Sequence, residues 1–173
     1  IYAFCAALLP CLCMMYRQVF VGVDGSPCSD LAGETALAFA AATGRGRCTG
    51  CHVYAARMHR QRFEDMEPGL PERYQEEERL DGLRATHDDL ISGGMALISD
   101  AYLAPLAAKA AARGVPFEPV TAEGRGYVEV LRLIREHRPD LTVLGATGHG
   151  QTPEVPLGSL AGRVLLHAGT RYL

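Results

Sequence analysis

The sequence predicts an α/β protein built on an open parallel sheet with helices on both faces. Short apolar runs rich in β-branched residues alternate along the chain with stretches whose apolar residues recur at helical spacing. Runs without alternating polar residues are typical of strands that are buried on both faces. The repeated strand–helix order favours a parallel sheet, and such sheets bind ligands at the carboxyl ends of their strands.

Length and composition indicate one soluble domain. The chain has 173 residues, 21% of them charged and 48% apolar, which is enough to bury a core. A net charge of −3 gives no electrostatic reason to bind nucleic acid or an anionic membrane, and the lack of Trp disfavours base stacking. We therefore expect neither nucleic acid nor a membrane as a partner.

The first 15 residues differ from the rest of the chain. They are apolar, lack an initial methionine and include Pro10. We interpret residues 1–15 as an extension outside the domain, with a truncated secretory leader as the alternative. The domain is expected to span residues 16–173.

The first half of this domain predicts two strands, a helix and a charged insert. Residues 19–24 form the first expected strand, and Ser29 or Asp30 is expected to cap a helix that ends near residue 43. Residues 51–56 form the second strand. The insert at 57–92 predicts a loop and then an exposed helix at about 72–90, with its charged residues on a solvated face.

The second half continues the alternation. A helix is expected at 95–113, kinked or split by Pro105, after a helix break at the glycines of "SGGM". Residues 116–122 predict a strand near a sheet edge, because prolines weaken it. A helix at 127–137, a strand at 140–146 and a last helix at 159–167 complete the pattern.

The stretch "GATGHGQTPEVPLGSLAGRV", at residues 145–164, follows the strand at 140–146 and begins like a phosphate-binding P-loop. Gln151 stands where a P-loop has its lysine, and Pro153 and Pro156 make an immediate helix improbable. The spacing predicts another arrangement, in which the turn through Gly148 and the helix start at 158–159 each present backbone N–H groups to one anion. The alternative is a ligand-free connection in which Ser159 only caps the helix.

Three other features carry weaker signals. Cys48 and Cys51 form a C-x-x-C pair, which is either a redox or half-zinc motif or, as we favour, two ordinary thiols of a cytoplasmic protein. Asp24, at a strand's carboxyl end, either contacts a ligand or caps a turn; we favour the ligand. We interpret His149 as a bystander, because no nucleophile or carboxylate is fixed beside it in sequence.

The glycine pattern Gly-x-x-Gly, nine residues, then Gly-Ser resembles the signature of the ATP-binding branch of the universal stress protein family. "VFVGVDGSPCS", "CHVYA" and "EGRGYVEVLRLIREHRPDLTVLGATGHG" resemble the family's segments in the same order. The resemblance implies a Rossmann-like fold of the adenine nucleotide alpha hydrolase type, with strand order 3-2-1-4-5. It also implies bound ATP, commonly with Mg²⁺, and homodimers that pair through the last strand.

The resemblance implies the positions of the nucleotide contacts. Asp24 and Val53 would contact the adenine or ribose end, and Gly145 would approach the ribose. The phosphates would lie on Gly148 and the helix start, and the full set of nucleotide-binding residues is Asp24, Val53, Gly145, Thr147, Gly148, Gly158 and Ser159.

Two departures from the family pattern stand out. Gly126 replaces the proline of E-G-x-P, and the chain ends in "GTRYL" where the family continues into a fifth strand. We expect that strand to be truncated or missing, and homodimers only where it is complete.

Two functions remain open from the sequence. The first is an ATP-binding regulatory domain with little or no turnover, since no nucleophile–base pair or arginine finger is evident and no catalytic residue is predicted. The second is a nucleotide-free dimerisation or interaction module of the same fold. Slow ATP hydrolysis and self-phosphorylation are weaker alternatives.

Overall fold

The computed structural model describes residues 16–149, 157–168 and 171–172, which form a parallel sheet flanked by helices. The strand order is β3-β2-β1-β4-β5, which confirms the predicted fold and order. The fifth strand is a two-residue stub among the described residues, as expected. The strands are β1 (Gln18–Gly22), β2 (Arg47–Tyr54), β3 (Phe117–Glu123), β4 (Leu141–Val143) and β5 (Arg171–Tyr172).

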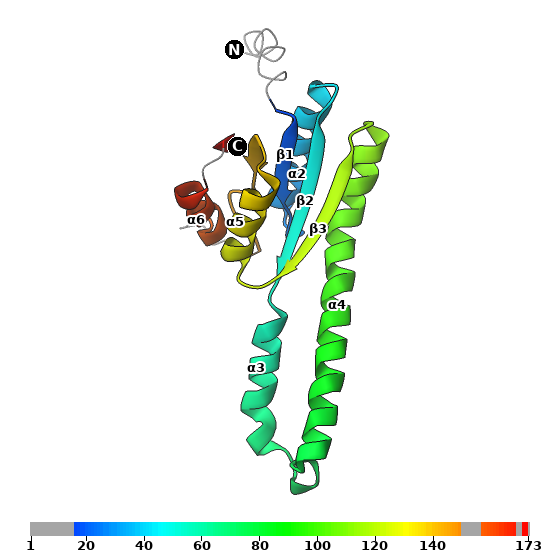
Figure 1. Cartoon of the computed structure of the whole chain (residues 1–173), viewed down its shortest axis with the longest axis vertical. Coiled ribbons are helices and arrows are strands. Elements are labelled where there is room, and N and C mark those ends of the chain that lie inside the picture. The colour runs from blue at the N-terminus through cyan, green and yellow to red at the C-terminus, as the bar shows by residue number, and fades with distance from the viewer. Residues whose placement is uncertain (1–15, 150–156, 169–170, 173) are drawn as a thin grey trace.

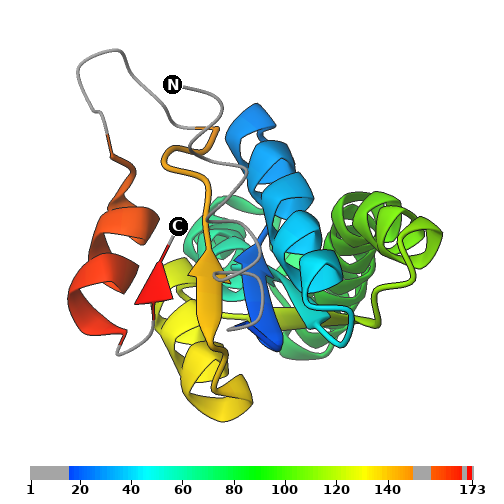
Figure 2. The same ribbon diagram turned by 90° about the horizontal axis from the view of Figure 1, so that it is seen from above.

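Helices cover the two faces of the sheet in pairs (Figure 2). Along β1 the side chains alternate, so that Val19 and Val21 pack beneath α2 (Pro27–Ala42) and α4 (Glu77–Ala112). Phe20 points to the other face and packs beneath α5 (Gly126–His137) and α6 (Ser159–His167). Strands buried on both faces explain why the apolar runs in the sequence lack polar alternation.

The start of α2 corrects the predicted cap. Ser26, rather than Ser29 or Asp30, is the N-cap, and its hydroxyl accepts a hydrogen bond from the Ser29 N–H at 3.2 Å. Pro27 at the first helical position has the fixed φ that a helix start needs, so the helix begins three or four residues earlier than predicted. Gly44, with φ of +66°, follows the helix, as expected.

The second strand also begins earlier than residue 51. Its pairing with β1 starts at Arg47 opposite Gln18 and continues through Gly50 opposite Val21. Glycine is typical of a turn in sequence, but Gly50 lies inside β2. The Phe117 ring occupies the space that a side chain at position 50 would need. Contact with β3 therefore explains a glycine inside a strand.

The charged insert is a helical hairpin, which corrects the loop predicted there. It consists of α3 (Ala56–Met66), two short 3₁₀ turns (Glu67–Gly69 and Glu72–Tyr74) and the first part of α4. Arg84 of α4 bonds Glu67 at 2.7 Å, and Arg60 of α3 pairs with Asp88. The hairpin projects far beyond the sheet (Figure 1).

Helix α4 runs unbroken from Glu77 to Ala112, so the predicted break at the glycines and the predicted split at Pro105 are both wrong. Gly93, Gly94 and Pro105 are exposed. Because they lie on the solvent side, water can reach the Ala101 carbonyl that Pro105 leaves without an N–H partner. The helix therefore tolerates three residues that usually end one.

The remaining elements follow the prediction with shifted ends. β3 lies at the sheet edge, α5 spans 126–137, and α6 spans 159–167. β4 is shorter than the predicted strand at 140–146, because the chain leaves the sheet at Leu144 and turns along a cavity. Residues 1–15, together with Gln151, Pro153 and Pro156, lie outside the described residues.

Candidate functional site

A cavity of about 460 Å³ opens at the carboxyl ends of β1, β2 and β4. Its volume is in the range of small-molecule sites. β1 is flanked by β2 on one side and β4 on the other, so the strand order reverses there. Open α/β sheets bind ligands at this switch point, because the chain leaves neighbouring strands in opposite directions and opens a crevice.

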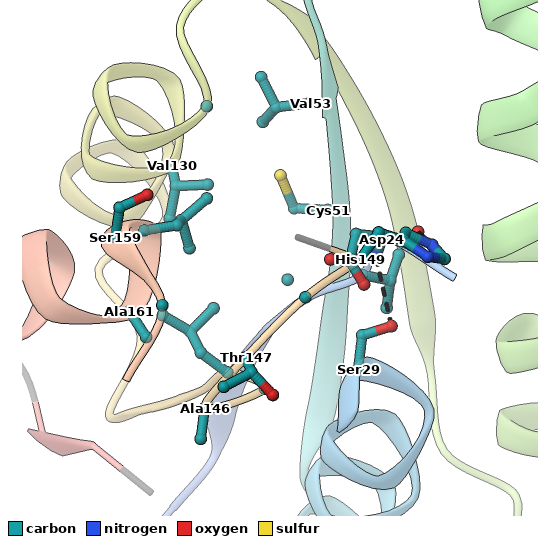
Figure 3. Close-up of a pocket in the computed structure, with 18 residues that line it drawn as sticks. Asp24, Ser29, Cys51, Val53, Val130, Ala146, Thr147, His149, Ser159 and Ala161 are labelled. Carbon is teal, nitrogen blue, oxygen red and sulfur yellow. Dashed lines mark hydrogen bonds between the residues drawn. The ribbon is translucent and has the colours of Figure 1, made fainter. Parts of the chain in front are cut away.

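The structure brings all seven residues of the predicted nucleotide site to this cavity (Figure 3). They come from the end of β1, from β2, from the loop after β4 and from the start of α6. In chain order they are Asp24, Val53, Gly145, Thr147, Gly148, Gly158 and Ser159.

The two glycine corners are joined directly. The Gly158 N–H donates to the Ala146 carbonyl at 2.7 Å, although residues 149–157 separate the Gly148 turn from Gly158. This bond uses the Gly158 N–H, so that group is not a donor to a ligand. The corners are therefore close enough to face one bound molecule.

The start of α6 supplies the remaining donors. Gly158 is the N-cap, and no side chain of the described residues caps the helix. The N–H groups of Ser159, Leu160 and Ala161 have no partner within the helix, and all three residues line the cavity. Ser159 is exposed and is the first residue of the helix, so the capping role that the ligand-free alternative gave it is wrong. This helix end, with its partial positive charge, favours an anion.

Close packing explains the two glycines of the turn after β4. A Cβ at Gly148 would collide with the Asp24 carboxylate, and a Cβ at Gly145 would lie 3.0 Å from the Ser29 nitrogen. Gly145 therefore lets the start of α2 approach the end of β4. Neither glycine has a positive φ, so close approach and not a left-handed backbone explains them.

Asp24 is a fixed carboxylate at the cavity wall. Its Oδ1 accepts a hydrogen bond from the Ser26 N–H at 2.9 Å. Burial alone would raise the pKa of Asp24, but hydrogen bonds from Ser26 and Ser29, together with the nearby His149, hold its pKa below the ordinary value. The carboxylate is therefore charged at neutral pH and acts as an acceptor for hydroxyl or amine groups of a ligand.

His149 has a role that the sequence did not reveal. Its Nε2–H donates to the Asp24 carbonyl at 2.8 Å and ties the loop after β4 to the end of β1. A second tie joins the Thr147 hydroxyl to the Cys28 thiol at 3.3 Å. Both ties link segments more than 100 residues apart, which explains why no local sequence signal indicated them.

An apolar wall completes the cavity. Val53 was expected there from the family resemblance, but the other members were missed in the sequence, where they indicated only core positions. Strand alternation on β2 could have indicated Cys51 together with Val53. The wall consists of Cys51, Val53, Val130, Leu144 and Leu160.

Few titratable side chains lie among the described residues that line the cavity. The described residues that line it include no Lys or Arg, and its titratable side chains are Asp24, Cys51 and His149. Burial raises the pKa of Cys51 to about 12, so its thiol is protonated and unreactive at neutral pH. Cys48 packs in the core cluster on the other face of the sheet, so the C-x-x-C pair cannot form one redox or metal site.

Comparisons with known proteins agree with this fold. UspA of Lactobacillus plantarum has a TM-score of 0.69 at 19% identity, over 91% of this chain and 96% of that chain. A universal stress protein in complex with cAMP has a TM-score of 0.58 at 22% identity, over 92% and 95%. An Arabidopsis thaliana universal stress protein family protein with AMP bound has a TM-score of 0.56 at 15% identity, over 91% and 89%.

At these identities the solved structures show a shared fold. No curated protein matches the sequence. The family model described as "Universal stress protein family", however, matches residues 15–170, nearly the whole chain. The chain therefore belongs to the universal stress protein family.

Proposed function

We propose that this protein is an ATP-binding regulatory domain with little or no turnover. The hydrogen bond from Gly158 to Ala146 carries the proposal, because it holds the first N–H groups of α6, which have no partner within the helix, beside the Gly148 turn at the switch point. Two sets of backbone donors then face one polyphosphate without a lysine. Structural neighbours that carry cAMP and AMP support an adenine nucleotide as the ligand.

The cavity residues fit the two ends of a nucleotide. The apolar wall around Val53 and Leu144 suits an adenine ring, and the Asp24 carboxylate suits ribose hydroxyls. Mg²⁺ would be held mainly by the phosphates, in keeping with its usual binding mode. The proposal also places the protein in the cytoplasm, as a homodimer where the C-terminal strand is complete.

Nucleotide binding is the direct test. Purified protein is heated to release any bound nucleotide, which is identified by mass, and the apo protein is titrated with ATP and Mg²⁺. At 100 times the dissociation constant, ATP should stabilise the protein by about 2.7 kcal/mol, a melting shift of several degrees. Absence of both retained nucleotide and a melting shift would leave the nucleotide-free interaction module as the function.

A further inference from the structure

Positive charge is scarce where the proposed nucleotide has its phosphates. Asp24 is the single acidic residue among the described residues that line the cavity, and that lining includes neither Lys nor Arg. The whole segment 139–162 contains no Lys or Arg in sequence, and its one basic residue is His149. Arg163 comes next in sequence, but it packs over the ring of Tyr127 and is not one of the lining residues. Within this part of the chain, His149 is therefore the side chain that can place a positive charge beside the phosphate donors.

The hydrogen bond of His149 determines which ring nitrogen can take up a proton. A carbonyl oxygen only accepts, so the Nε2 atom that lies 2.8 Å from the Asp24 carbonyl oxygen carries a hydrogen. In the neutral ring Nδ1 then lacks a hydrogen, and it is the atom that is protonated when the ring becomes positive. His149 is exposed, so water supplies this proton. The ring can change its charge while its bond to the end of β1 stays in place.

Protonation of His149 changes the charge that a bound phosphate meets. The ring lies beside Asp24 (Figure 3), and the two side chains interact electrostatically. While the ring is neutral, the Asp24 carboxylate gives the described lining a single negative charge, which repels phosphate groups. When the ring is protonated, the two charges cancel. His149 follows Gly148 directly, so its charge acts on the end of the cavity where the phosphates are proposed to bind.

The neighbouring titratable groups keep their charge where an ordinary histidine changes it. Asp24 stays charged, as described above. Burial raises the pKa of Cys51 on β2 to about 12, so its thiol stays neutral. Burial also lowers the pKa of His52, against the smaller opposing effect of Asp24, so His52 is protonated only at lower pH than an ordinary histidine. The uncharged Tyr102 ring of α4 packs against His52, and the lining residues from α2, α5 and α6 are not titratable.

We infer that His149 is the residue by which the cavity recognises the phosphate charge of its nucleotide, so that affinity for ATP rises as the pH falls and affinity for adenosine does not. The inference rests on the proposed function and adds a specificity-determining residue to it. Phosphate groups favour the protonated ring, so ATP binding takes up protons. A ligand whose binding takes up protons binds more tightly at lower pH. Backbone N–H groups alone give no such dependence, because they do not titrate.

Isothermal titration at about pH 6 and about pH 8 tests the inference, with excess Mg²⁺ to keep the phosphates of ATP deprotonated. The wild-type protein should bind ATP about fivefold more tightly at the lower pH. His149→Gln keeps a donor for the Asp24 carbonyl but no titratable group, so it should bind ATP equally at both pH values. His149→Arg is positive at both, so at the higher pH it should bind ATP about fivefold more tightly than the wild type. Adenosine should bind each protein equally at both pH values.

His52→Gln is the matched control, because His52 also interacts electrostatically with Asp24 but is not one of the described lining residues. It should keep the pH dependence of the wild type. Titrations in buffers of different ionisation enthalpy give a second readout: ATP binding should take up protons in the wild type and none in His149→Gln.

The inference fails if the wild type binds ATP equally at both pH values, or if His149→Gln keeps the dependence. It also fails if His52→Gln loses the dependence, or if adenosine shows it. A protein that binds neither ATP nor adenosine at either pH would instead overturn the proposed function, and the inference with it. The two failures are therefore distinguishable.

Discussion

Gly148 shows how a single residue links the fold to the ligand site. The carboxylate of Asp24 occupies the space in which a side chain at position 148 would begin. A Cβ there would displace Asp24 from its hydrogen bond with the Ser26 N–H and move the loop that carries the proposed phosphate donors. Under the proposed function, the same atom positions serve packing and binding.

Gly148→Ala should weaken ATP binding at least tenfold, a loss of about 1.4 kcal/mol. Isothermal titration of the variant and the wild-type protein measures this difference. Gly162→Ala is the control, since Gly162 lies inside α6 with its nearest neighbour, the Leu157 side chain, 3.6 Å from an added Cβ. Unchanged affinity in Gly148→Ala would contradict a backbone cradle at this corner.

At the scale of elements, His52 and Ser99 fasten α4 to β2. Ser99 donates its hydroxyl proton to the Met95 carbonyl at 2.9 Å, so it accepts from the His52 Nδ1–H at 2.8 Å. Tyr102, one turn further along α4, packs edge-on against the His52 ring. The buried polar pair thus sets the position at which the long helix leaves the sheet.

Ser99→Ala should destabilise the protein by about 1–3 kcal/mol, because it leaves the buried Nδ1–H without a partner. Thermal unfolding measures this, with the exposed Ser92→Ala of the same helix as the control.

Burial lowers the pKa of His52, so the unfolded chain takes up more protons than the native one and stability falls as pH drops below about 6.5. His52→Gln should flatten this dependence between pH 7 and 5.5. An unchanged slope would show that His52 is not its source.

At the scale of the whole molecule, the sheet and the hairpin differ in what holds them together. Phe20, Leu37 and Val164 of the sheet layers are fully buried. Helix α3 has no buried residue, and the distal part of the hairpin is joined by the stacked rings of Phe63 and His87, by the buried Leu80 and by ion pairs, of which Arg84–Glu67 is part-buried and bidentate and the others are exposed. Exposed ion pairs contribute about 0–1 kcal/mol each and weaken in salt.

Hydrogen exchange should therefore show two levels of protection. Amides of residues 57–90 should exchange through local opening of the hairpin, and those of β1 and β4 only through global unfolding. Added salt at about 0.5 M should speed exchange in the hairpin and leave the sheet unaffected, because the Debye length falls to a few ångströms. Equal protection in both regions would show that the hairpin and the sheet unfold together.

The sequence by itself determined the order of strands and helices along the chain and the glycines of the candidate site. Local signals sufficed for these, because buried strands such as 19–22 lack polar alternation and because glycines at 145, 148 and 158 mark close backbone approach. The tertiary structure alone decided the hairpin, the unbroken α4 and the cap at Ser26. Long-range contacts, such as Arg84 with Glu67 and His149 with Asp24, and exposure of Pro105 to water override local propensities. A short segment of sequence reveals neither the long-range contacts nor which residues are exposed to water.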